Sequence, residues 1–270
     1  MYHHINWHEG DLVTLTPKDF ENHLRFLARQ KVQTLFVDEL VSWLQKREKI
    51  TRPAAALTFD DGYLDNWVYA FPLLKKYQSK ATIFIVTSWI SEGDQRKAWM
   101  GKAEDALPPI PTHQEGLRRI SQGDYSPGLH WAEAQEMIHS GLVDIQSHTH
   151  FHHDYFIGRN RPQLDPAQRD LLVDDLARSQ ELLEQKLGQK CRYLSWPWGR
   201  YDGEAVALAQ GLGFEALATT DKGVNYPGSN PMAIKRIVTK SGKDHWFPRR
   251  WRIYSHRFLG QLYSRVVGRI

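Results

Sequence analysis

Short apolar runs alternate with longer segments of helical spacing along most of the chain. Apolar runs lie at 54–59 and 142–145, the latter within an expected strand at 143–147, and the run at 81–87 is rich in β-branched residues, which favour strands. Thr16 and Pro17 predict the start of a helix, because Thr caps free backbone N–H groups and Pro suits the first helical position. Strands that alternate with helices at this spacing predict a mostly parallel α/β sheet or barrel.

The same patterns place the remaining elements. We expect helices near 38–47, 65–78, 131–140 and 165–187, and two short strands near 193–196 and 214–219 with a helix between them. Residues 96–130 interrupt the alternation, because they contain several Pro and Gly residues and show little periodicity. A connection of this length is uncommon in a compact domain unless it has a function, so we expect the segment to cover one rim of a site.

Ionisable side chains follow two of the predicted strands. Asp60 and Asp61 come directly after the first apolar run, and His148 and His152 follow the expected strand at 143–147. A carboxylate and two imidazoles form a ligand set that leaves a divalent metal accessible to water. The second carboxylate could serve as a general base, and the carboxyl ends of strands are where barrel enzymes place their sites. The sequence therefore predicts a hydrolase.

Composition limits the class of protein. A chain of 270 residues with 41% hydrophobic residues fits one large domain. It contains no run of about 18 apolar residues that could span a membrane, and its first residues lack the pattern of a secretory signal. Cys191 is the only cysteine, which excludes an internal disulfide and fits a reducing compartment. We therefore expect a cytoplasmic protein.

The net charge of +4 is unevenly distributed. Residues 235–270 contain ten Lys or Arg and one acidic residue, so this segment carries +9 and the rest of the chain −5. Apolar residues between 251 and 267 follow helical spacing, which predicts a basic amphipathic helix. Such a helix either docks on the domain with a solvated basic face or binds an anionic membrane or glycan. No nucleic-acid-binding motif accompanies the charge, so we expect no nucleic-acid partner.

Three short motifs carry a resemblance to a known family. They are TFDDG at 58–62, HTHFH at 148–152 and SWPWG at 195–199. The chain resembles polysaccharide deacetylases of the NodB-homology type, in carbohydrate esterase family four. The similarity covers residues 1–240 apart from the insert at 96–130, and leaves 241–270 as a basic amphipathic extension. The resemblance implies a distorted (β/α) barrel and metal-dependent removal of N-acetyl groups from amino sugars.

The resemblance also implies roles for individual residues. Asp61, His148 and His152 would bind one divalent metal, and Asp60 would be the base that takes a proton from the attacking water. Zinc suits two imidazoles and a carboxylate, although cobalt, nickel, iron or manganese can bind such sites. The backbone N–H of Trp198 occupies the family position that stabilises the oxyanion.

A leaving amine needs a proton, so a general acid is expected. Tyr2-His3-His4-Ile5 resembles the start of the poly-N-acetylglucosamine deacetylases, a branch in which an N-terminal His takes this role. His3 is the candidate and His4 the alternative, because side chains alternate along a strand and only one can face the site. Ser195 stands where other family members have an Arg that contacts the catalytic Asp.

Aromatic residues near the third motif complete the predicted site. Trp196, Trp198 and Tyr201 could contact a sugar ring, although packing is an equal alternative for the two tryptophans. The leading hypothesis is an N-deacetylase acting on a bacterial envelope polysaccharide, a lipopolysaccharide or a lipid-linked saccharide, with peripheral contact to the inner membrane through 246–270. The alternatives are a deformylase or O-acetyl esterase acting on a related sugar, and an inactive glycan-binding protein.

Overall fold

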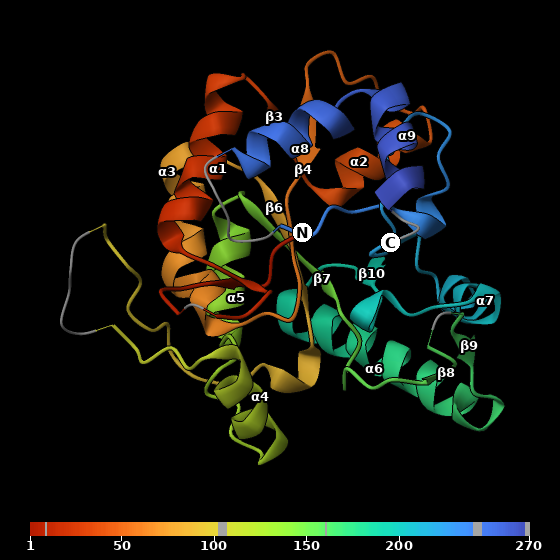
Figure 1. The fold of residues 1–270 in the computed structure, drawn as a ribbon. Coiled ribbons are helices and arrows are strands. Elements are labelled where there is room, and N and C mark those ends of the chain that lie inside the picture. Colours follow the sequence, from red (N-terminus) through yellow and green to blue (C-terminus); the bar gives the residue numbers. More distant parts are fainter. Residues whose placement is uncertain (9, 102–106, 160, 240–244, 268–270) are drawn as a thin grey trace.

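The centre of the protein is a curled sheet of five parallel strands, seen in a computed structural model (Figure 1). The structure describes residues 1–267 except 9, 102–106, 160 and 240–244. In spatial order the strands are β11 (Ala216–Ala218), β10 (Tyr193–Ser195), β7 (Val143–Ser147), β6 (Ala81–Ile85) and β5 (Thr58–Phe59). The strands are short and almost wholly buried, as expected for a parallel sheet that is covered on both faces.

Extended segments continue this sheet at both edges. Tyr2 pairs with Phe59 beside β5, and Ile234 pairs with Ala218 beside β11, both in parallel. The two edges then meet, because the N–H of Thr239 donates to the carbonyl oxygen of Met1 at 3.0 Å. The predicted distorted (β/α) barrel is therefore confirmed.

Helices pack around this sheet at most of the predicted places. Thr16 caps the first helix by accepting a hydrogen bond from the N–H of Asp19, as the sequence predicts. The main helices around the sheet are α1 (Pro17–Arg29), α2 (Val37–Leu44), α3 (Phe71–Tyr77), α5 (Trp131–His139), α6 (Arg169–Leu187) and α7 (Gly203–Gly211). Smaller paired strands are β1 (His4–Ile5) with β2 (Thr14–Leu15), β3 (Gln33–Leu35) with β4 (Ala54–Ala56), and β8 (Phe156–Ile157) with β9 (Gln163–Leu164).

Two predicted elements are divided in the structure. The run at 54–59 forms two strands, because β4 pairs with β3 whereas β5 pairs with β6. The predicted helix near 65–78 begins as a π-helix at Asn66–Ala70 and continues as α3. Pro72 lacks the N–H that would bond to the carbonyl of Val68, and that carbonyl accepts instead from the N–H of Trp99 at 2.9 Å.

The insert at 96–130 has more structure than its irregular pattern suggested. It contains α4 (His113–Ser121), whose nine residues include only two large apolar side chains, Leu117 and Ile120. Arg96 fixes the start of the insert through paired hydrogen bonds of 2.8 and 2.7 Å to the buried carboxylate of Glu133. The expectation that the insert covers a rim of the site stays a prediction, and residues 102–106 lie outside the described part.

The C-terminal segment forms two helices, α8 (Trp246–Tyr254) and α9 (Arg257–Val267), where the spacing suggested one continuous stripe. α8 packs on the domain, since the ring of Phe247 stacks on His23 of α1 with centroids 4.0 Å apart. α9 turns Phe258, Leu259 and Leu262 outward. Among the described residues, no helix is long and apolar enough to cross a membrane.

Candidate active site

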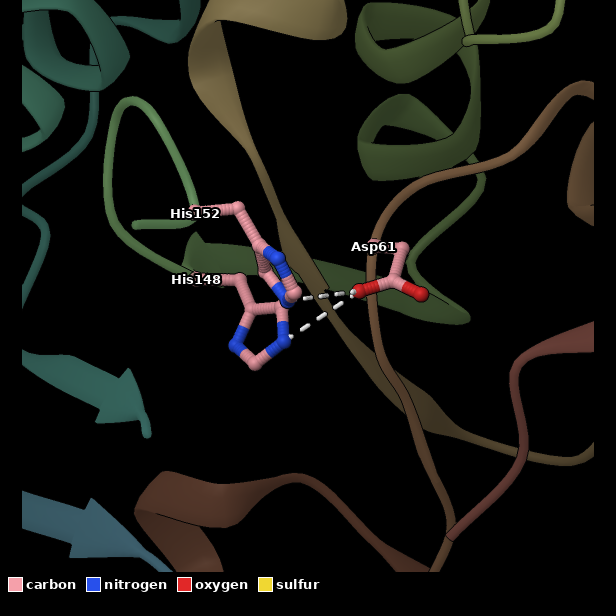
Figure 2. A group of neighbouring side chains, drawn as sticks. All are labelled: Asp61, His148 and His152. Atoms are coloured by element: carbon pink, nitrogen blue, oxygen red, sulfur yellow. Dashed lines mark ion pairs between the residues drawn. The ribbon is translucent and has the colours of Figure 1, made fainter. Parts of the chain in front are cut away.

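Three predicted metal ligands meet at the carboxyl ends of β5 and β7. The imidazoles of His148 and His152 both point toward the carboxylate of Asp61 (Figure 2). The Nε2 atoms of the two histidines lie 3.2 and 3.6 Å from one carboxylate oxygen of Asp61, and the three candidate ligand atoms lie within 4.8 Å of one another. The described residues thus contain a group that could hold one metal ion.

Hydrogen bonds fix how these ligands are presented. The Nδ1 atom of His148 lies 2.7 Å from the carbonyl oxygen of Ser195 and donates to it, which leaves Nε2 as the free ligand atom. The N–H of His152 donates to the Oγ1 of Thr149 at 3.0 Å. The first bond orients the ring of His148, and the second closes the loop between the two histidines through the backbone of His152.

The backbone around the site is held in an unusual conformation. Asp61, Thr149, His152 and Trp198 have φ values of 76°, 67°, 56° and 54°, in the left-handed region that residues other than glycine rarely adopt. Each such residue costs on the order of 1 kcal/mol or more and persists only where the surrounding contacts require it. All four residues belong to the motifs that carry the candidate site.

The ionisation of the ligands suits a cation. Burial lowers the pKa of His152 to about 4, so its imidazole is neutral near pH 7. Burial alone would raise the pKa of Asp61, but its hydrogen bond to His148 and the surrounding histidine charges lower it. Burial opposes the protonation of His148, yet its bond to Asp61 and the charge of Asp60 raise its pKa. A proton on His148 occupies the position a metal would take, so the donor set fits a divalent ion.

The candidate base, Asp60, is buried in a pair with Arg236, a residue that the sequence reasoning missed. Two guanidinium nitrogens of Arg236 donate to the two carboxylate oxygens of Asp60 at 2.7 and 2.8 Å. Ser195 joins the pair, because its Oγ accepts from Arg236 at 2.8 Å and donates to Asp60 at 3.3 Å. Arg236 therefore supplies, from a segment after β11, the guanidinium absent at position 195.

The pairing with Arg236 favours the ionised form of Asp60, the candidate base. Burial alone would raise the pKa of Asp60, but the charge of Arg236, followed by that of His148, lowers it below its ordinary value. A third bond, from the Nε of Arg236 to the carbonyl oxygen of Thr219 at 2.9 Å, fixes the guanidinium. Asp60 is thus an ionised carboxylate with its position fixed by hydrogen bonds.

The two N-terminal histidines have different environments. His4 is buried, its Nδ1 lies 2.7 Å from a carboxylate oxygen of Asp65, and its ring stacks on Tyr63 with centroids 3.8 Å apart. The pKa of His3 is affected by the residues of the candidate site. Burial lowers it, and the charge of Asp61 opposes that shift. His4 is thus engaged in a buried pair with Asp65, and His3 stays the predicted candidate for proton transfer.

The three aromatic residues predicted to contact a sugar ring differ in how far they are exposed. Trp198 is 55% exposed, and its ring lies 4.3 Å from that of His152, centroid to centroid. Trp196 is 1% exposed and packs within the core, so it presents no ring face to a sugar. Tyr201 donates from its hydroxyl to Asp221 at 2.6 Å. Of the three, Trp198 has the exposure that stacking requires.

Comparison with known proteins agrees with this geometry. A family profile described as polysaccharide deacetylase matches residues 47–217. A Bacillus subtilis (strain 168) protein named as a polysaccharide deacetylase, YxkH, is 28% identical over 90% of this chain and 71% of its own length. A poly-β-1,6-N-acetyl-D-glucosamine N-deacetylase of Staphylococcus aureus (strain MRSA252) is 22% identical over 88% of this chain and 72% of its own.

Solved structures show the same fold. The IcaB structure from Ammonifex degensii superposes with a TM-score of 0.71 at 22% identity, covering 94% of this chain and 95% of that one. The Streptococcus pyogenes deacetylase PplD, in complex with acetate, gives 0.67 at 21% identity, covering 88% and 90%. Fold and motifs define a hydrolase of the NodB-homology class. The chain belongs to the polysaccharide deacetylase family.

Proposed function

We propose that this protein is a metal-dependent N-deacetylase of an amino-sugar glycan. The observation that carries the proposal is the position of an ionised, buried base, Asp60, next in sequence to a candidate ligand, Asp61. Hydrolysis of an amide needs water activated beside an electrophile, and these adjacent residues would supply the two functions. A structural ion pair alone would not require the oriented histidines that face Asp61.

The residues of the chain divide the chemistry among them. Asp61, His148 and His152 would hold the metal, which when bound polarises the acetyl carbonyl and acidifies water. Asp60 takes the proton of the attacking water, and Arg236 keeps that carboxylate ionised and oriented. The N–H of Trp198 donates to the developing oxyanion, and His3 protonates the leaving amine.

We propose zinc as the metal, because two neutral imidazoles and one carboxylate are a common catalytic zinc set. Cobalt, nickel, iron and manganese remain candidates, since the site's donors do not distinguish sharply among them. The substrate would be an N-acetylhexosamine of an envelope polysaccharide, lipopolysaccharide or lipid-linked saccharide. A poly-N-acetylglucosamine deacetylase among the relatives supports this substrate class, and the exposed ring of Trp198 offers a surface for a sugar.

We further propose that α9 contacts an anionic membrane surface. Its Phe258, Leu259 and Leu262 are exposed on one face, at spacings that place them together on a helix. The surrounding segment carries the excess of Lys and Arg that anionic lipids attract. This contact would place the enzyme near glycans that are assembled at the membrane.

The product acid tests the activity. Purified protein loaded with zinc or cobalt is incubated with N-acetylglucosamine oligomers, and with N-formylated and O-acetylated counterparts of matched length. We expect acetate and one free amine per turnover from the N-acetyl substrate. Formate, or acetate without a new amine, would identify a deformylase or an O-acetyl esterase. Binding of the oligomers without any product would contradict the assignment of a hydrolase.

A further inference from the structure

A second cavity lies at the other end of the barrel from the candidate metal ligands. It has a volume of about 640 Å³, within the range of roughly 300–1,000 Å³ that is typical of small-molecule sites. Its walls come from α2, β4, α8 and the segment after β11. Figure 1 shows α2, α8 and α9 gathered at one end of the sheet, with α4 at the opposite end.

The walls of this cavity are mainly apolar. The apolar side chains that line it include Leu35, Val37, Trp43, Ala56, Val224, Trp246 and Trp251. Strand β4 contributes only alanines over its length, and their small side chains leave the space that larger residues would fill. An apolar cavity of this size in a well-packed protein is unusual, because interiors are normally close-packed. The cavity is therefore suited to an apolar ligand.

The charged side chains of the cavity are all cationic. Among the described residues that line it, the ionised side chains are Arg52, Lys235, Arg236 and Arg250, with no Asp or Glu. Arg236 is already paired with Asp60, so the cations that remain to bind an anion are Arg52, Lys235 and Arg250, the last of which also donates to the hydroxyl of Tyr263. Arg250 lies over the rings of Trp246 and Tyr263, where its aliphatic stem packs and its guanidinium remains half-buried. An apolar chamber with a cationic wall complements an amphiphile with a negatively charged head.

α8 lines the cavity, and the neighbouring helix α9 has an exposed apolar face. α9 packs on α8, with the rings of Tyr254 and Tyr263 5.9 Å apart. Its exposed apolar face includes Phe258, which is 76% exposed. An exposed apolar helix face beside an apolar cavity is the arrangement through which a chain could pass from a bilayer into a protein.

We propose that this cavity binds an alkyl chain of an anionic membrane phospholipid, with the head group at Arg250, Lys235 and Arg52. Of the residues given a role in deacetylation, only Arg236 lines this cavity, and binding there does not require that chemistry. It extends the membrane contact proposed for α9, which would bring the lipid to the cavity. Occupancy would hold α8 and α9 against the domain and retain the enzyme at an anionic surface.

Binding is tested first with a soluble amphiphile, so that the cavity is measured apart from the membrane contact. Dodecyl phosphate below its micellar concentration is titrated calorimetrically into the full-length protein, beside neutral dodecyl maltoside and cationic dodecyltrimethylammonium. We expect dodecyl phosphate to bind at one site and at least about tenfold more tightly than either control, about 1.4 kcal/mol. Equal binding of all three, or none, would overturn the proposal.

Variants locate the site. Ala56→Phe fills the cavity and should weaken dodecyl phosphate binding at least about tenfold, and Arg250→Gln should weaken it about three- to tenfold. Arg249→Gln removes the same charge from the neighbouring position, which is exposed and does not line the cavity, and should leave affinity within about twofold. Unchanged binding in both cavity variants would overturn the proposal, and their melting temperatures and acetate release confirm folding.

The source of the ligand is tested with vesicles. Protein recovered from phosphatidylglycerol vesicles should carry one phospholipid in native mass spectrometry, whereas protein exposed to phosphatidylcholine vesicles should carry none. Phe258→Ser with Leu262→Ser should abolish vesicle binding and leave dodecyl phosphate affinity unchanged, which separates the membrane contact from the cavity. Recovery of a free fatty acid alone, or capture of both lipids equally, would contradict the assignment to an anionic phospholipid.

Discussion

The two ends of the barrel differ in the side chains that line them: ionised groups at one end and mainly apolar groups at the other. At the carboxyl ends of the strands, Asp60, Asp61 and His148 lie almost fully buried within a few ångströms of one another. At the amino end, around β4 and α8, the wall is mainly apolar, and the ionised side chains among its described residues are cationic. Buried ionised groups cost several kcal/mol unless they are paired, so the chain confines most of that cost to the end where chemistry needs it.

Arg236 belongs to both ends. Its guanidinium pairs with Asp60, while the same residue lines the amino-end cavity. The contrast teaches that the end with the candidate metal ligands depends on specific polar contacts, whereas the cavity end depends on apolar volume. Substitutions that act on only one end, or on their shared residue, test this division.

The largest effect is expected at the base. Asp60→Asn should lower turnover by about 10²- to 10⁴-fold, because the amide cannot accept the proton of the attacking water. The ligands Asp61, His148 and His152 are unchanged, so metal content should stay near wild type. Acetate release under saturating substrate measures the loss. Full turnover in Asp60→Asn would remove this residue from the mechanism.

The shared residue is expected to affect both stability and pH dependence. Arg236→Met leaves a buried carboxylate without its partner, which should cost about 3–5 kcal/mol in the free energy of unfolding. The charge of Arg236 lowers the pKa of Asp60, so its removal should raise that pKa and shift the acidic limb of kcat/KM to higher pH. Urea denaturation and a pH–rate profile measure the two effects.

A conservative control sharpens this test. Arg236→Lys keeps the charge and loses the paired hydrogen bonds, so its acidic limb should lie between those of wild type and Arg236→Met. An acidic limb that stays in place in both variants would show that Arg236 has only a structural role.

Substitutions of the two N-terminal histidines should have different effects, on turnover for His3 and on stability for His4. His3→Asn should reduce kcat by about 10²-fold with little change in melting temperature, because the amide cannot donate the proton in its place. His4→Asn breaks a buried pair with Asp65 and should mainly destabilise the fold, by about 3–5 kcal/mol. Steady-state kinetics and thermal unfolding distinguish the two. A loss of kcat confined to the His4 variant would reassign the general acid.

The smallest effect is expected at the rim of the site. Trp198→Asn keeps a residue that tolerates the left-handed backbone but removes the exposed ring. A lost sugar contact of about 0.5–1.5 kcal/mol should raise KM by up to about tenfold with kcat nearly unchanged. Trp198→Phe keeps an aromatic ring and should remain closer to wild type. Identical KM values in all three proteins would exclude sugar stacking.

The sequence could place the three candidate metal ligands together because its signals for them are local. Each pair of functional residues follows an apolar run, and parallel strands bring their carboxyl ends to one edge. The candidate ligands Asp61, His148 and His152 could therefore be placed together in advance, and the structure brings them together. The family and the barrel were also readable from these motifs.

Features that depend on contacts between distant parts of the chain could not be predicted from local sequence patterns. Arg236 lies 176 residues after Asp60, and nothing near it in sequence distinguishes it from the other basic residues of that segment. The α4 helix has only two large apolar side chains, and the π-helix depends on how Pro72 frees a carbonyl that accepts from Trp99. The depth of Trp196 likewise follows from tertiary packing, which spacing alone does not specify.

The central claim is that the catalytic end is a metal site served by a separate base. Metal content by elemental analysis after dialysis, measured in parallel with acetate release for wild type, Asp60→Asn and His148→Ala, tests it most directly. We predict about one metal per chain in wild type and Asp60→Asn, loss of metal in His148→Ala, and acetate release only from wild type. Absence of metal from wild type even after reloading with zinc or cobalt, or acetate release that persists in metal-free protein, would contradict the account.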